Sequence, residues 1–113
     1  MKYLLLGAVT EKGQQLQPPD LETWMLEIGA WYEKHAVSGK MADSGYQLDR
    51  PDTAKTIRAS GVTDGPYIEA KEVLGGYSVL ETDTIEEAVD IAKSWPGVDS
   101  GLIVMEVRPV VVQ

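Results

Sequence analysis

His35 is the only histidine in this chain of 113 residues, and the chain contains no cysteine. Imidazole is the side chain whose ordinary pKa lies nearest to neutral pH, so His35 is a candidate acid–base catalyst. It lies on the apolar stripe of a predicted helix, near the end of that helix, where it could reach the rim of a pocket. The same position suits a histidine of the core or of a dimer contact, bonded to a backbone carbonyl. The sequence leaves both interpretations open.

A second group of ionisable residues begins at Asp64, which is followed by a glycine and a proline, and continues with Glu69, Lys71 and Glu72. A carboxylate beside a cation can act as a general base with a shifted pKa, which makes Asp64 the second candidate catalytic residue. The alternative is structural. Asp64 would accept backbone N–H bonds within its own turn, and the other three residues would form a solvated surface or connect the turn to a strand.

The large aromatic residues are tryptophans and tyrosines only, because the chain has no Phe. Most of them suit a core, but two or three could line a cavity for a small apolar or aromatic ligand. We therefore predict that ligand-binding residues are found near the Asp64 turn, namely Tyr67, Glu69, Lys71, Glu72 and Tyr77.

The sequence contains no phosphate-binding glycine loop, no nucleophile elbow and no calcium-binding loop. One His and no Cys also leave little basis for a transition-metal site. We expect the protein to work without a metal or a cofactor.

The formal net charge is −8, and the acidic residues are spread along the chain. Such a field repels phosphate backbones and anionic lipids, so we expect neither nucleic acid nor a membrane as a partner. The apolar run near the start ends at Gly7, too early for a signal peptide or a membrane span. These features predict a cytoplasmic protein.

Hydrophobic periodicity defines the elements of the first half. Residues 3–9 are apolar at both odd and even positions, as in a strand covered on both faces. Residues 10–17 are expected to form a loop. A helix then begins with Asp20 as its cap and ends at Gly39. Its predicted apolar face consists of Leu21, Met25, Ile28, Tyr32 and His35, with Trp24 and Trp31 beside it.

The second half is divided by turn residues. Gly75 and Gly76 are expected to break the chain before a strand, and Thr84 with Glu87 forms a capping box at the start of a helix that stops at Pro96. The expected elements are a weaker strand at 41–48, a hairpin at 55–63 that turns at Ser60-Gly61, a strand at 77–82, a helix with the apolar face Ile85, Ala88, Val89, Ala92 and Trp95, and a strand at 102–107.

The order of elements is β-α-β, a hairpin, and β-α-β, within one domain that spans residues 1–113. Right-handed crossovers place both helices on one face of a mostly antiparallel sheet, which predicts an α+β fold of the ferredoxin-like type. Because the first and last strands are apolar at both odd and even positions, the face of the sheet away from the helices is also apolar. Monomers rarely expose such a face. We therefore expect a homodimer that pairs sheet on sheet.

Three segments carry a resemblance to a known family: Asp64-Gly-Pro-Tyr67, Glu69-Ala-Lys-Glu72 and Leu74-Gly-Gly-Tyr77. They resemble the signature of the DGPF, or YCII-related, domain family, with Tyr67 where the family usually has Phe. Both ends of the chain extend the similarity. The resemblance implies a ferredoxin-like fold that pairs into a dimeric α+β barrel. Some YCII members pair a His with an Asp for acid–base catalysis, but their His lies earlier in the first helix, where this chain has none.

Two hypotheses for the function follow. The first is a dimeric, non-enzymatic or regulatory module, because the resemblance links DGPF domains to sigma factors. The alternative is a small-molecule-binding protein or a cofactor-free acid–base enzyme that acts on a small, partly aromatic or apolar substrate. A cavity between the helices and the sheet would favour the alternative, and a packed interior would favour the module.

Overall fold

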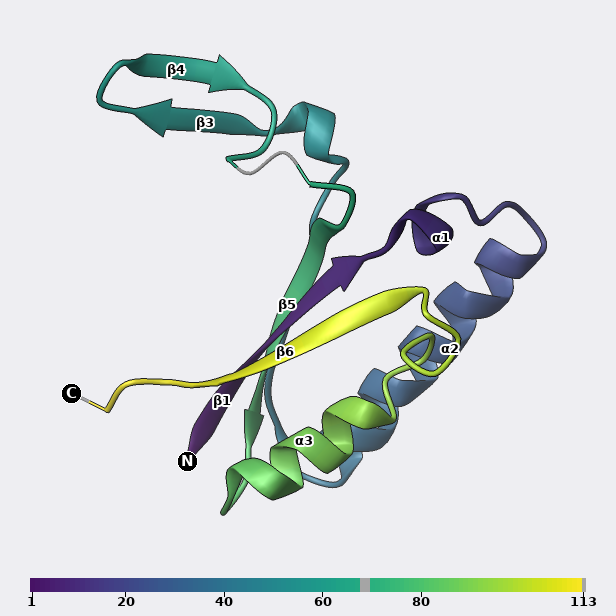
Figure 1. Ribbon diagram of the computed structural model, residues 1–113. Coiled ribbons are helices and arrows are strands. Elements are labelled where there is room, and N and C mark those ends of the chain that lie inside the picture. The colour runs from purple at the N-terminus through teal and green to yellow at the C-terminus, as the bar shows by residue number, and fades with distance from the viewer. Residues whose placement is uncertain (68–69, 113) are drawn as a thin grey trace.

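The computed structural model describes residues 1–67 and 70–112 of the chain. Figure 1 shows a four-stranded sheet with helices α2 and α3 on one side of it and a two-stranded hairpin that stands apart. Along the chain the elements are β1 (Lys2–Val9), α1 (Glu11–Gln14), α2 (Asp20–Val37), β2 (Met41–Gln47), a 3₁₀ turn (Pro51–Thr53), β3 (Lys55–Arg58), β4 (Gly61–Asp64), β5 (Val73–Glu81), α3 (Ile85–Lys93) and β6 (Ile103–Pro109).

The sheet has the strand order β2-β5-β1-β6, and each neighbouring pair is antiparallel. Helix α2 connects β1 to β2 across β5, and α3 connects β5 to β6 across β1. Both helices cover the same face of the sheet (Figure 1). The predicted ferredoxin-like α+β fold is therefore confirmed.

The two faces of strand β1 explain why its sequence is apolar at both odd and even positions. Tyr3 and Leu5 lie under the helices, and their exposed fractions are 3% and 0%. Leu4 and Leu6 point to the opposite face and are half-buried. The pattern thus reflects one face covered by helices and a second apolar face that no described element of the chain covers.

The buried face of α2 is centred on its tryptophans, not on the predicted stripe. Trp24 and Trp31 are buried together with His35, whereas Met25 is 39% exposed. A large indole gains more from burial than a Met side chain does, provided that its N–H finds an acceptor. Both do: Trp24 donates to the carbonyl of Pro96, and Trp31 donates to a serine hydroxyl. The tryptophans, predicted beside the stripe, thus lie at the centre of the buried face, and Leu21, Ile28 and Tyr32 of the stripe pack around them.

Two predictions about the segment before α2 are wrong. Residues 10–17 contain the short helix α1, whose first turn is capped by Thr10, since Thr10 Oγ1 accepts a hydrogen bond from Gly13 N at 3.2 Å. Gly13 lies so close to the segment before β6 that a Cβ would be 2.2 Å from a carbonyl oxygen. This glycine therefore serves a close backbone contact. Asp20 is the first residue within α2, and the cap position belongs to Pro19.

The glycine pair lies inside β5. The register between β1 and β5 shifts after the pair Gly7 and Gly76, because Ala8 lies opposite Leu74. Gly75 is therefore the extra residue of a β-bulge. The predicted strand start at residue 77 is wrong, since a bulge accommodates the glycines without ending the hydrogen-bonded ladder.

The remaining turns follow the sequence more closely. Thr84 caps α3 as predicted, because its Oγ1 accepts from Glu87 N at 3.2 Å, although the Glu87 carboxylate accepts from Asp83 N. In the hairpin, Arg58 pairs with Gly61. The turn therefore lies at residues 59–60, one residue before the predicted position.

Candidate functional site

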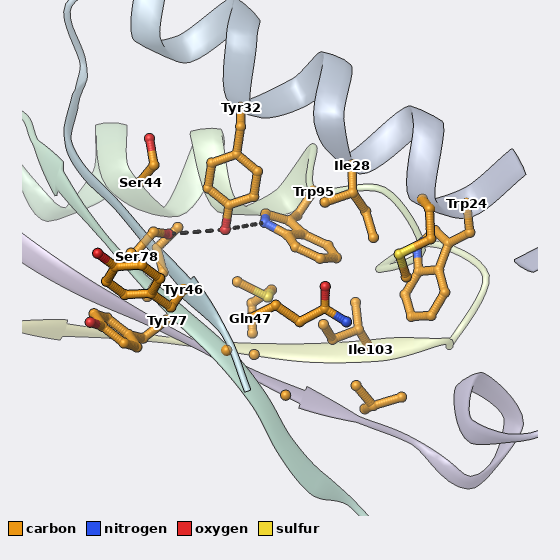
Figure 2. A pocket seen from close by; sticks show the side chains of 18 residues that line it. Trp24, Ile28, Tyr32, Ser44, Tyr46, Gln47, Tyr77, Ser78, Trp95 and Ile103 are labelled. Atoms are coloured by element: carbon orange, nitrogen blue, oxygen red, sulfur yellow. Dashed lines mark hydrogen bonds between the residues drawn. The ribbon is translucent and has the colours of Figure 1, made fainter. Parts of the chain in front are cut away.

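A cavity of about 340 Å³ lies between α2 and the helix-covered face of the sheet. Figure 2 shows its labelled side chains, which come from α2, from the strands and from the segment after α3. Four of its lining residues are glycines of the sheet. The lining consists of Leu5, Gly7, Val9, Trp24, Met25, Ile28, Tyr32, Ser44, Gly45, Tyr46, Gln47, Gly75, Gly76, Tyr77, Ser78, Trp95, Ile103 and Met105.

A small polar cluster in the lining is centred on the hydroxyl of Tyr32. This hydroxyl donates to Ser78 Oγ at 3.3 Å and accepts from Trp95 Nε1 at 3.4 Å, as the dashed lines in Figure 2 show. Both distances are longer than the common range for hydrogen bonds of these types. The oxygen of a bound molecule could therefore replace either contact at little cost.

The walls around this cluster are aromatic and aliphatic. The rings of Trp24 and Trp95 meet edge to face, with centroids 6.5 Å apart, and the rings of Tyr32 and Trp95 do so at 6.2 Å. Ile28 and Ile103 contribute aliphatic surface. These contacts hold the walls in place, which suits a pocket that exists before a ligand arrives.

The lining contains no Asp, Glu, Lys, Arg or His among the described residues. Its polar groups are hydroxyls, one side-chain amide and an indole N–H, all neutral at pH 7. A charged molecule would lose its hydration there without gaining an opposite charge. The site thus suits a neutral molecule with one or two polar atoms.

His35 lies outside this lining. It is buried against Trp31, with ring centroids 4.4 Å apart, and its Nε2 has no hydrogen-bond partner among the described residues. Burial lowers the pKa of His35 below its usual value, and the neighbouring charge of Lys34 lowers it further. The ring therefore stays neutral near pH 7 and belongs to the core.

Asp64 is the last residue of β4, and its carboxylate pairs with Lys55 Nζ on the other strand of the hairpin. The two side chains are 82% and 66% exposed. The predicted backbone N–H bonds to this carboxylate are not found in the described part of the loop. The reason is that Asp64 lies directly opposite Lys55 in the register of the hairpin, so the cation is nearer.

The five predicted ligand-binding residues are not brought together. Tyr67 is 73% exposed near the hairpin, and Lys71 and Glu72 are exposed before β5. Glu69 lies outside the described residues. Tyr77 borders the cavity. The centroid of its ring lies 6.3 Å from that of the Tyr46 ring. Their ligand contacts remain a prediction.

Sequence reasoning missed the centre of the site. The sequence predicts Tyr32 only as part of a helix face and Ser78 only as part of a strand. Gly75 and Gly76, predicted only to break the chain before a strand, are the one feature singled out in the sequence that lies in the floor of the cavity. Nothing local marks Gly7, because its role depends on the strand that lies opposite.

Within the described ranges 1–67 and 70–112, no three His, Asp or Glu side chains are grouped so as to hold a metal ion. The described helices include none that is both long enough and apolar enough to cross a membrane.

Comparisons with known proteins agree with this architecture. The sequence model of the YCII-related domain matches residues 1–112. An uncharacterized protein of Rhizobium meliloti (strain 1021) is 30% identical over 92 residues, which are 78% of this chain and 73% of that protein. A solved structure, 5-chloro-2-hydroxyhydroquinone dehydrochlorinase from Burkholderia phenoliruptrix AC1100 in complex with 2,5-dihydroxybenzoquinone, is similar with a TM-score of 0.52. It is 16% identical, and the match covers 97% of this chain and 93% of that chain, so the likeness concerns the fold alone.

Proposed function

This chain belongs to the YCII-related domain family, and we propose that it binds a small, partly aromatic or apolar molecule in the cavity between α2 and the sheet. The observation that carries this proposal is the cavity itself. Its volume of about 340 Å³ lies at the lower end of the range for ligand sites, and its walls are apolar with a few convergent polar groups.

The solved dehydrochlorinase supports the size of the ligand. Its structure holds 2,5-dihydroxybenzoquinone, a single-ring compound. A ring of that size with oxygen substituents is compatible with the Tyr32, Ser78 and Trp95 cluster in volume and in hydrogen bonding.

Binding is a better proposal than acid–base catalysis. A general base must lie within hydrogen-bond reach of the proton that it removes, and the described lining offers no carboxylate or imidazole for this role. Both candidate catalytic residues lie elsewhere, His35 in the core and Asp64 on the hairpin. A regulatory role beside a sigma factor stays a prediction, since none of the described contacts bears on it.

We also propose a homodimer formed through the bare face of the sheet. This face presents Leu4, Leu6 and Val79 at half-buried positions and Val104 at 48% exposure. Apolar residues in adjacent strands form a continuous patch, and a symmetry mate with the same patch would cover it.

Native mass spectrometry combined with a pair of cavity variants tests the ligand proposal. Ile28→Trp places a large ring in the lining, while Leu26→Trp places the same ring on the 76% exposed side of α2. We expect the parent and Leu26→Trp to retain a co-purified or added small aromatic molecule, and Ile28→Trp to lose it. Equal retention by the two variants, or no binding by the parent, would refute the proposal.

A further inference from the structure

The floor of the cavity contains a pair of glycines on adjacent strands. Gly7 of β1 lies directly opposite Gly76 of β5, on the face that the helices cover. The preceding pair on that face, Leu5 and Ser78, carries side chains and is fully buried. Along β1, the next residue on that face is Val9. Strand β1 therefore carries side chains on either side of this level, and neither strand carries one at the level itself.

This arrangement gives the recess a particular shape. Its floor is the backbone of Gly7 and Gly76 on two strands that lie about 4.8 Å apart. The side-chain ends of Ile103 and Met105 border this floor beside Gly7, and the backbone of Tyr46 borders it beside Gly76. Ile28 and Tyr32 of α2 and the ring of Trp95 form the roof, on the side of the cavity away from the sheet (Figure 2). The space between a flat floor and this roof is a slot, which admits a thin object more readily than a thick one.

We propose that the Gly7–Gly76 floor makes the cavity selective for a flat, neutral aromatic ring that lies against the sheet. The inference rests on the proposed ligand-binding function and narrows its ligand class. A hydroxyl or carbonyl oxygen on the ring bonds at the Tyr32 and Ser78 hydroxyls, whose own contact is long. A saturated ring of the same skeleton is puckered and thicker, so it fits the slot poorly.

Gly7 is the position at which this selectivity can be tested. Its φ is not in the left-handed region, so alanine is compatible with its backbone. A Cβ there would lie 3.0 Å from Ile103 Cδ1 and 3.4 Å from Met105 Sδ, both near the ends of flexible side chains that can shift. Gly76 offers no such test, because its Cβ would lie 2.9 Å from the backbone oxygen of Tyr46.

The experiment compares 2-naphthol with decahydro-2-naphthol, which have the same carbon skeleton and one hydroxyl each. Both are titrated into the ¹⁵N-labelled parent, Gly7→Ala and Gly29→Ala. Gly29 is the matched control, because it lies on α2 and a Cβ there meets nothing within 4 Å. Amide chemical shifts give the dissociation constant, and the shifts of the Gly7 and Gly76 signals locate the ligand.

For the parent and Gly29→Ala, we expect 2-naphthol to bind at least about tenfold more tightly than its saturated analogue, with the largest shifts at Gly7 and Gly76. One methyl group in a tight apolar slot changes affinity by about tenfold or more. Gly7→Ala should therefore weaken 2-naphthol binding by at least that factor. It should leave the remaining spectrum, and so the fold, unchanged.

Two results would overturn the inference in different ways. Equal binding of the two compounds at the cavity, or an unchanged affinity in Gly7→Ala, would refute the flat-ring selectivity and leave the ligand-binding function standing. Binding of neither compound to the parent, or binding with shifts only outside the cavity, would refute both.

Discussion

At the residue scale, the contrast between His35 and Tyr32 shows how position decides chemistry. They lie three residues apart on α2, yet only Tyr32 lines the cavity. His35 is buried at 8% exposure beside Trp31 with its Nε2 unpaired in the described structure. A buried, unpaired imidazole resists protonation, because the charged form would lose its hydration.

The lowered pKa of His35 predicts that stability falls on acidification. In the unfolded chain His35 titrates near pH 6.5, and in the folded chain its pKa is lower because of burial and Lys34. The unfolded state therefore binds the proton first, so this contribution is complete above about pH 6.5 and is lost as the pH falls from there toward the folded pKa. Urea unfolding at several pH values across this window measures the effect.

His35→Phe is the control for this prediction. It keeps a ring against Trp31 and removes the titrating group. We expect the free energy of unfolding of this variant to depend less on pH below about 6.5 than that of the parent. An identical pH dependence in the two proteins would contradict the assignment to His35.

At the scale of elements, the hairpin β3–β4 places Asp64 in a different role from the one that its turn suggested. Asp64 and Lys55 face each other across the two strands with both side chains exposed. Such surface pairs contribute little, because water screens the charges and the long side chains lose freedom.

We expect Asp64→Ala and Asp64→Asn to change the free energy of unfolding by less than about 1 kcal/mol each. Lys55→Ala, which removes the other partner, should have a similarly small effect. Chemical denaturation measures all three. A loss of more than about 1 kcal/mol in Asp64→Ala that Asp64→Asn recovers would instead indicate buried backbone bonds to the carboxylate.

At the scale of the whole molecule, the chain is a thin plate. Its extents are 44 × 43 × 18 Å, and the smallest of them corresponds to one layer of helices on one sheet. The radius of gyration is 15.2 Å, against about 13 Å for a compact domain of this length. The plate shape and the projecting hairpin (Figure 1) both leave surface that a compact monomer would bury.

The uncovered sheet face predicts the oligomeric state. Leu6 lies on the bare face in the central strand β1, so Leu6→Lys would place a charge inside the proposed interface and weaken the dimer by at least about tenfold. Leu26→Lys adds the same charge on the exposed side of α2, and the dimer should persist. Sedimentation velocity measures both variants, and a parent that is monomeric at micromolar concentration would contradict the proposal.

The order of the strands and of the two long helices could be predicted from the sequence, because it depends on residues close together in the chain. The apolar run of β1, the periodicity of α3 and the Thr84 cap are set within one or two helical turns or a few residues of a strand. Reasoning from neighbouring residues predicted the wrong partner for Asp64, because its partner Lys55 lies nine residues away across the hairpin.

The cavity was decided by the tertiary structure alone. Tyr32 meets Ser78 across 46 residues, and Gly7 meets Gly76 because both strands keep one register from the pair Lys2 and Glu81 as far as this level. Shifting that register by one residue would send these groups to the opposite face of the sheet. The floor of the cavity lies where two adjacent strands both carry a glycine. The sequence does not show which residues of the two strands lie opposite each other.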